Sequence, residues 1–248
     1  MEIISSIHRI EIPFEDIYTT VFVIETPSGA VLFDTATFPQ DMDDYVFPVL
    51  ERLGAELKCV FLSHAHRDHA GGLARVLEKF PGVPVAARSG ALAEKYANVF
   101  APEDGERILD VLETVGIPGH TRDSMGLMDT RTGTLLTGDS LQAYGIFGSG
   151  SWAANISLPR EHLEAIGRLR GMKIETLIAS HDYHPCGFIA RGAEVGGYLN
   201  QCEGALRFIR RLIDENPQLD DDAIAQKFTQ SGLPKLGARI VGAVRREL

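Results

Sequence analysis

Three histidines and an aspartate fall within six positions of this chain, directly after an apolar run. Residues 57–62 predict a buried strand, and apolar residues at helical spacing over 72–80 predict a helix after it. The turn between them carries His64, His66, Asp68 and His69. Imidazole and carboxylate groups bind Zn, Fe and similar ions, so this turn predicts a metal site. His64 and His66 can converge on one ion while Asp68 and His69 point to a neighbouring position, so the turn can supply ligands to two metals.

The composition of the chain disfavours nucleic acids and membranes as binding partners. The chain has 248 residues, of which 44% are hydrophobic, and a net charge of −10 that repels nucleic acids and anionic membranes. The sequence does not begin with a basic and apolar leader, and no run approaches the ~20 apolar residues that cross a bilayer. We therefore expect a cytoplasmic protein that acts on a small-molecule substrate, without a nucleic-acid or membrane partner. Three scattered cysteines, expected as small buried residues, fit a reducing compartment: Cys59, Cys186 and Cys202.

Strand and helix signals alternate up to about residue 190. Strands are predicted at 3–12, 20–25, 31–33, 57–62, 83–87, 111–117, 126–128, 133–137 and 176–179, and helices at 41–53, 72–80, 90–99 and 160–169. This alternation predicts an α/β core over residues 1–190. From residue 191 a long apolar stripe and a second helix capped by residues 220–222 predict a helical extension, 191–248, packed on the core. The extension is expected to shape the pocket entrance or a homodimer contact.

Three later segments offer further ligands at the ends of predicted strands. His120 follows a Pro-Gly break, and Asp139 follows the apolar strand 133–137, where a carboxylate could bridge two cations. Residues 178–185 contain both His181 and His184, of which we expect one to be a ligand. His181 is favoured because it stands closer to the end of the strand.

These residues together resemble the metallo-β-lactamase-fold superfamily of metal-dependent hydrolases over about residues 1–190. The H-x-H-x-D-H, Pro-Gly-His, Gly-Asp and final histidine elements occur in order, although Ser180-His181-Asp182 replaces the usual Gly-His-Gly. The resemblance implies a four-layer αββα sandwich with two metal ions bridged by Asp139. It assigns one ion to His64, His66 and His120, and the other to Asp68, His69 and His181. By the same resemblance Asp34 accepts a hydrogen bond that orients a ligand histidine.

Two bridged cations would activate a shared water as hydroxide near neutral pH, and Asp68 could pass a proton to the leaving group. We therefore expect a hydrolase that uses a metal-bridging hydroxide on an ester, thioester or lactone. Zinc is the default metal, although this donor set also accepts Fe or Mn. An acid at position 139 is unlike the true β-lactamases, so antibiotic hydrolysis is not expected.

Substrate contacts are expected from loops that follow the ligands. Tyr144, Tyr183 and His184 are candidates, with packing or solvent exposure as the alternative for each, and the glycine-rich segment 145–152 is a candidate substrate loop. The competing functions are a phosphodiesterase or ribonuclease of the same fold, an iron-dependent sulfur dioxygenase, and a binding protein with a residual metal site. A basic groove would favour the nuclease, and oxygen consumption with a persulfide would favour the dioxygenase.

Overall fold

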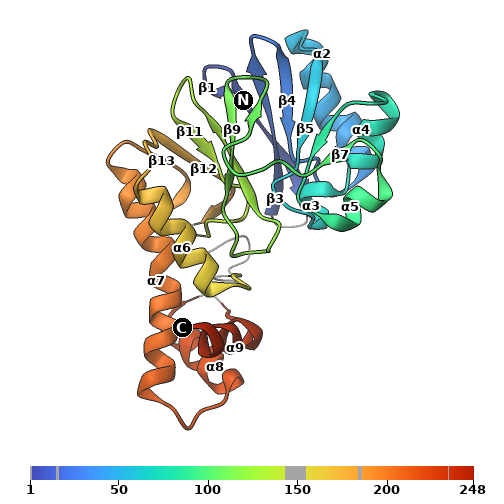
Figure 1. The fold of residues 1–248 in the computed structure, drawn as a ribbon. Coiled ribbons are helices and arrows are strands. Elements are labelled where there is room, and N and C mark those ends of the chain that lie inside the picture. The colour runs from blue at the N-terminus through green and yellow to red at the C-terminus, as the bar shows by residue number, and fades with distance from the viewer. Residues whose placement is uncertain (1, 15–16, 143–154, 184–185, 234) are drawn as a thin grey trace. The chain divides into compact units, whose positions relative to one another are not determined.

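The structure is a computed structural model that describes residues 2–14, 17–142, 155–183, 186–233 and 235–248. These residues form two sheets and a series of helices, so the predicted α/β class is confirmed (Figure 1). Among the helices of the described ranges, none combines the length and the apolar character needed to cross a membrane.

The first sheet has seven strands that pair in chain order. β1 to β4 pair antiparallel, and β4 to β7 pair parallel. The carboxyl ends of β4 and β5 therefore meet at one edge, which brings the residues after them together. The strands are β1 Glu2–Ile4, β2 Ile7–Phe14, β3 Ile17–Thr26, β4 Gly29–Phe33, β5 Leu57–Phe61, β6 Val85–Ala86 and β7 Val99–Phe100.

The second sheet has six strands in the order β13-β12-β11-β10-β9-β8. β11 and β12 are parallel, with Leu136 opposite Ile178, so the segments after both strands leave the sheet at the same edge. The strands are β8 Arg107–Ile108, β9 Leu112–Gly116, β10 Met125–Asp129, β11 Thr134–Leu136, β12 Thr176–Tyr183 and β13 Gly187–Arg191.

The helices follow the predicted apolar periodicity in most places. They are α1 Pro39–Asp41, a π turn η1 Met42–Val46, α2 Phe47–Leu53, α3 Arg67–Ala70, α4 Leu73–Lys79, α5 Gly90–Lys95, α6 Pro159–Arg170, α7 Glu194–Glu215, α8 Asp221–Gln230 and α9 Ala238–Glu247. The C-terminal helices expected from the sequence are therefore present.

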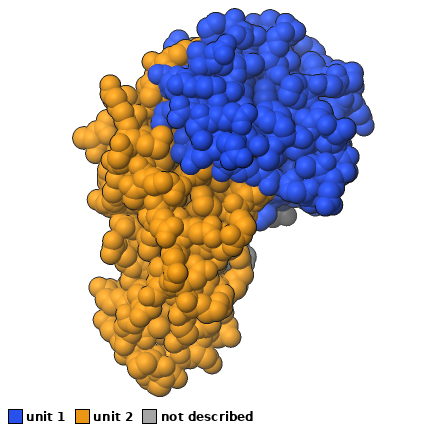
Figure 2. Space-filling model, in the orientation of Figure 1, with its two compact units in different colours: residues 1–115, 127–130 blue, residues 116–126, 131–248 orange. Residues whose placement is uncertain are grey.

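The described chain divides into two compact units, residues 1–115 with 127–130 and residues 116–126 with 131–248 (Figure 2). In unit 1, α2 and α4 bury their apolar faces on alternate residues of β2 to β5. In unit 2, α6 to α9 enclose a second core that includes Ile156, Leu206, Phe228 and Val241. The proposed boundary at residue 190 stays a prediction.

Several local predictions were wrong. The single strand predicted over 3–12 is two strands, β1 and β2, that pair antiparallel. The helix predicted over 90–99 ends at Lys95, because Tyr96 is extended and Val99 pairs with Val85 in the sheet. β12 continues past residue 179 to Tyr183, through a shift of register against β13. Cys186 is only partly buried, whereas Cys59 and Cys202 are buried as expected.

Candidate metal centre

In unit 1 the turn that carries His64, His66, Asp68 and His69, called the donor turn below, leaves β5 and enters α3 within a few residues. His66 has extended backbone and precedes the first residue of α3, so Asp68 and His69 lie in the first turn of that helix. His64 Nε2 lies 3.0 Å from His66 Nδ1, a separation suited to two nitrogens that share one ion. His69 Nε2 lies 3.4 Å from Asp68 Oδ2. This cluster presents three imidazoles and one carboxylate.

Asp34 lies beneath this cluster and is fully buried. Its carboxylate accepts hydrogen bonds from the Ser63 amide at 2.7 Å, the Ser63 hydroxyl at 2.9 Å and His69 Nδ1 at 2.7 Å. Burial raises the pKa of the Asp34 carboxyl, and the contacts with His69 and Ser63 oppose that rise. A carboxylate that accepts the Nδ1 proton leaves His69 Nε2 as the ligand atom. This contact supports the predicted orienting role of Asp34, which stays a prediction.

Two glycines after the donors allow the 34–37 segment to lie against α3. A Cβ on Gly71 would stand 2.0 Å from Thr37 O, and one on Gly72 would stand 2.2 Å from Thr35 O. The Gly71 amide donates to Ala36 O and the Gly72 amide to Thr35 O. These glycines therefore permit the close backbone approach that brings Asp34 to His69.

In unit 2, Asp139 stands next to two histidines. Asp139 Oδ1 lies 3.1 Å from His181 Nε2, and Asp139 Oδ2 lies 3.8 Å from His120 Nε2. All three side chains are buried. The parallel pairing of β11 with β12 explains why Asp139 and His181 meet, since both lie at the carboxyl ends of these strands.

The outer nitrogen of His120 has two neighbours that sequence reasoning missed. Nδ1 lies 2.6 Å from the Asn155 carbonyl oxygen and 3.1 Å from Gln142 Nε2. The Asn155 carbonyl only accepts and makes the shorter contact, so Nδ1 carries the proton and Nε2 offers its lone pair. The Gln142 amide nitrogen only donates, so it is a neighbour of Nδ1 and not its hydrogen-bond acceptor. Gln142 Oε1 in turn accepts from the Asn155 amide at 2.7 Å. No sequence signal could have identified Asn155, because its contact with His120 is made by a backbone carbonyl.

The two residues that precede α6 bind the backbone of Gly119, on the other side of His120. The amides of Ser157 and Leu158 donate to Gly119 O at 2.8 and 2.9 Å. Gly119 has φ +152°, and a Cβ there would stand 2.6 Å from the Cβ of His162. His162 is buried, and this burial lowers its pKa to about 4.

The remaining predicted site residues have different outcomes. Tyr183 is buried in β12, and its ring meets the His181 ring edge-on at 6.5 Å. Tyr144, His184 and the 145–152 segment lie outside the described residues. The choice of His181 over His184 therefore stays a prediction, with the contact to Asp139 in favour of His181.

The donor chemistry of both units fits divalent metal ions. The clusters consist of histidine nitrogens and aspartate oxygens only, a set that suits Zn, Fe or Mn. The donors are His64, His66, Asp68 and His69 in unit 1 and His120, Asp139 and His181 in unit 2.

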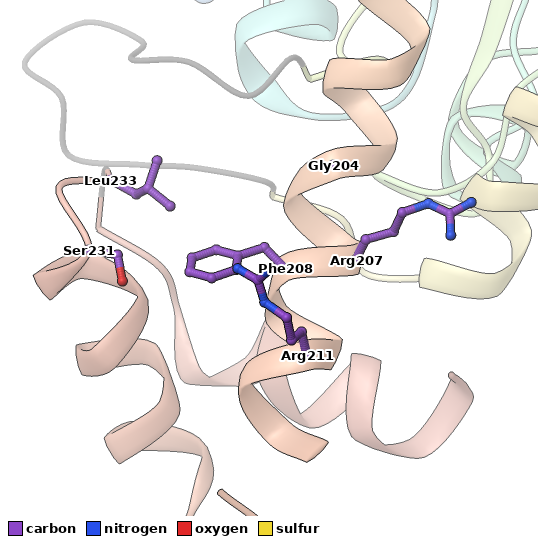
Figure 3. A pocket seen from close by; sticks show the side chains of 6 residues that line it. All are labelled: Gly204, Arg207, Phe208, Arg211, Ser231 and Leu233. Carbon is purple, nitrogen blue, oxygen red and sulfur yellow. The ribbon is translucent and has the colours of Figure 1, made fainter. Parts of the chain in front are cut away.

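The described residues that line a hollow of about 450 Å³ beside α7 include no histidine or carboxylate side chain (Figure 3). Two of its lining side chains are arginines that already have partners. Arg207 binds Glu203 at 2.8 Å, and the Arg211 guanidinium lies over the Phe208 ring at 4.8 Å. We therefore do not assign a reaction to this hollow.

Comparison with known proteins identifies the class. The metallo-beta-lactamase superfamily matches residues 15–181, and the chain belongs to this superfamily. The fold resembles that of a metallo-beta-lactamase from Pontibacter korlensis with a TM-score of 0.62 and 22% identity, covering 82% of this chain and 97% of that one. It also resembles rubredoxin oxygen:oxidoreductase from Desulfovibrio gigas, with a TM-score of 0.67 and 16% identity, over 98% of this chain and 74% of that one. The predicted metallo-β-lactamase fold is thus confirmed.

Among sequence relatives, a hydroxyacylglutathione hydrolase from Gloeobacter violaceus is 29% identical over 184 residues, which are 71% of this chain and 68% of the relative. Two further proteins with that name are matched over only 54% and 60% of their length. The relatives' names agree with the enzyme class expected from the sequence, a metal-dependent hydrolase.

Proposed function

We propose that this chain is a dinuclear metal-dependent hydrolase that cleaves a thioester, ester or lactone bond in a small molecule, with a hydroxyacyl thioester as the first candidate substrate. Superfamily membership and the two donor clusters support the reaction class. The relatives named hydroxyacylglutathione hydrolase support the choice of a thioester.

The observation that carries the proposal is the setting of Asp139. Its two oxygens face different histidines, Oδ1 toward His181 and Oδ2 toward His120. A carboxylate with one oxygen beside each of two imidazoles is arranged to bridge two cations. We assign His120 to the ion of His64 and His66, and His181 to the ion of Asp68 and His69, as the family resemblance implies.

The side chains of the clusters have separate tasks. Asp34 and the Asn155 carbonyl hold protons on the outer nitrogens of His69 and His120, which keeps both rings in the ligand tautomer. Asp68 is partly exposed, and its carboxylate can carry a proton to the leaving group. A pair of divalent ions bound there, zinc by default, would lower the pKa of a bound water toward ~7 and would polarise the substrate carbonyl.

The test is a substrate panel with the zinc-loaded protein. We expect hydrolysis of a hydroxyacyl glutathione thioester, a lactone or a carboxylic ester to exceed hydrolysis of RNA and phosphodiesters. Asp139→Ala and His66→Ala should each lower kcat by at least about a thousandfold, because each removes a ligand of the reacting centre. Far-UV circular dichroism should stay near wild type.

His8→Ala is the matched control, since His8 lies in β2 and pairs with Glu25 rather than with the donors. It should keep wild-type turnover. RNA cleavage that matched thioester turnover, or oxygen consumption with a thiol persulfide by the iron-loaded protein, would replace this proposal with one of the two competing activities.

A further inference from the structure

The C-terminal helix α9 makes hydrogen bonds to the segment that contacts His120. The Arg239 guanidinium donates to Asn155 Oδ1 and, at 3.0 Å, to Ser157 Oγ. Asn155 and Ser157 are the residues whose backbone groups bind His120 Nδ1 and Gly119 O. One arginine of α9 therefore contacts two of the residues that fix the His120 turn, Asn155 and Ser157.

Apolar packing supports the same connection. Ile156, between these two residues, is buried in the core formed with Ile240, Val241 and Val244 of α9. Segment 155–157 is thus bound to α9 by a buried side chain on one position and by Arg239 on the two flanking positions. These contacts all lie within unit 2.

We propose that Arg239 is a positioning residue for His120, through which the helical extension fixes the geometry of one metal ligand. A charged donor that bridges Asn155 and Ser157 limits rotation of the Asn155 peptide, whose carbonyl must point at His120 Nδ1. If that carbonyl turns away, the ring can rotate or exchange its proton between the nitrogens, and the lone pair on Nε2 is lost. This role relies on the proposed function only in taking His120 as a ligand.

The first test compares zinc affinity by chelator competition. We expect Arg239→Ala to bind zinc about three- to tenfold more weakly, a smaller loss than the 10- to 100-fold typical of a partner that touches the ligand directly. Arg239→Lys should recover part of the loss, since one ammonium can reach Asn155 or Ser157. Combining Arg239→Ala with Asn155→Ala should lower zinc affinity by less than the product of the two single losses, because each single substitution already removes the contact between Arg239 and Asn155 Oδ1.

Arg245→Ala is the matched control on the same helix. Arg245 donates to Asp221 Oδ1 and Leu219 O, both at 2.9 Å, and so joins α9 to the start of α8 instead of to the His120 turn. Its loss should lower the unfolding midpoint in urea and leave zinc affinity unchanged. Equal losses of zinc affinity in Arg239→Ala and Arg245→Ala would overturn the proposal, because Arg239 would then act only through stability.

A second readout does not depend on metal binding or on activity. In the metal-free protein, ¹⁵N NMR of the histidine rings should show His120 protonated on Nδ1, and Arg239→Ala should shift the signals toward a mixture of tautomers. An unchanged His120 spectrum would overturn the proposal even if the protein proved to bind no zinc, whereas a lack of zinc binding with the expected shift would overturn only the proposed function.

Discussion

Two residues beside the metal-binding donors have a backbone conformation that residues with a side chain rarely adopt. Asp34 has φ +64° and Ala36 has φ +56°, a left-handed backbone that costs about 1–2 kcal/mol for a residue with a side chain. The contacts of Asp34 with Ser63 and His69 offset that cost. Strain at these two positions therefore serves to place a carboxylate under the donor turn.

His162 gives a prediction about pH. Its folded pKa of about 4 lies below the value of about 6.5 for an exposed histidine, because burial disfavours the charged ring. As the pH falls from 6.5 toward 4, the unfolded chain binds a proton that the folded chain does not, so stability is lost over this window. The wild type should lose about 2 kcal/mol of unfolding free energy between pH 7.5 and 5 from this group alone.

The measurement is urea denaturation at both pH values for the wild type and for His162→Leu, which cannot titrate. The variant should show the smaller loss, by about the same 2 kcal/mol, whatever its stability at pH 7.5. Equal losses in the two proteins would show that His162 is protonated in the folded state near its ordinary pKa.

At the scale of elements, the contact between α6 and the His120 turn predicts a large effect at Gly119. An alanine there would place its Cβ 2.6 Å from the Cβ of His162 and 2.7 Å from Nδ1 of its ring, at a φ of +152°. We expect Gly119→Ala to lower the unfolding free energy by about 3 kcal/mol and to weaken zinc binding, since the turn must move.

Gly105→Ala separates the steric contact with His162 from the cost of the backbone conformation. Gly105 also has a positive φ, +83°, but open space surrounds its Cβ position. Gly105→Ala should lower the unfolding free energy by only about 1 kcal/mol, which is the cost of the left-handed backbone without a steric clash. Urea denaturation of both variants checks the difference, and similar losses would mean that the contact with His162 does not constrain the turn.

The helices, strands and donor residues differ in how well the sequence predicts them. Apolar periodicity located α4, α6 and α7 and the strands that carry the donors, because burial imposes a regular spacing. It missed β13, did not separate α9 from the rest of the helical extension, and ended β12 before His181. The donors were predictable because histidine and aspartate carry their chemistry in the side chain, whereas the Asn155 carbonyl and the packing of Gly71 and Gly72 depend on tertiary approach.

For the whole molecule, the acidic composition and the donor clusters both favour the binding of cations. A net charge of −10 is compatible with cation uptake, and each cluster concentrates carboxylate and imidazole groups that the folded chain holds together. The unfolded chain does not hold these donors in place. Metal binding should therefore stabilise the folded chain as a linked equilibrium.

This linkage predicts that zinc raises the thermal midpoint of the wild type and that a chelator lowers it again. Free zinc at 100 times its dissociation constant should add about 2.7 kcal/mol per ion to the unfolding free energy. His66→Ala in unit 1 and His181→Ala in unit 2 should each lose part of the zinc-induced shift, because each substitution removes one of the proposed ligands. His8→Ala should keep the full shift in differential scanning calorimetry, since His8 pairs with Glu25. A zinc shift that survived in both ligand variants would mean that the ions bind elsewhere on the protein.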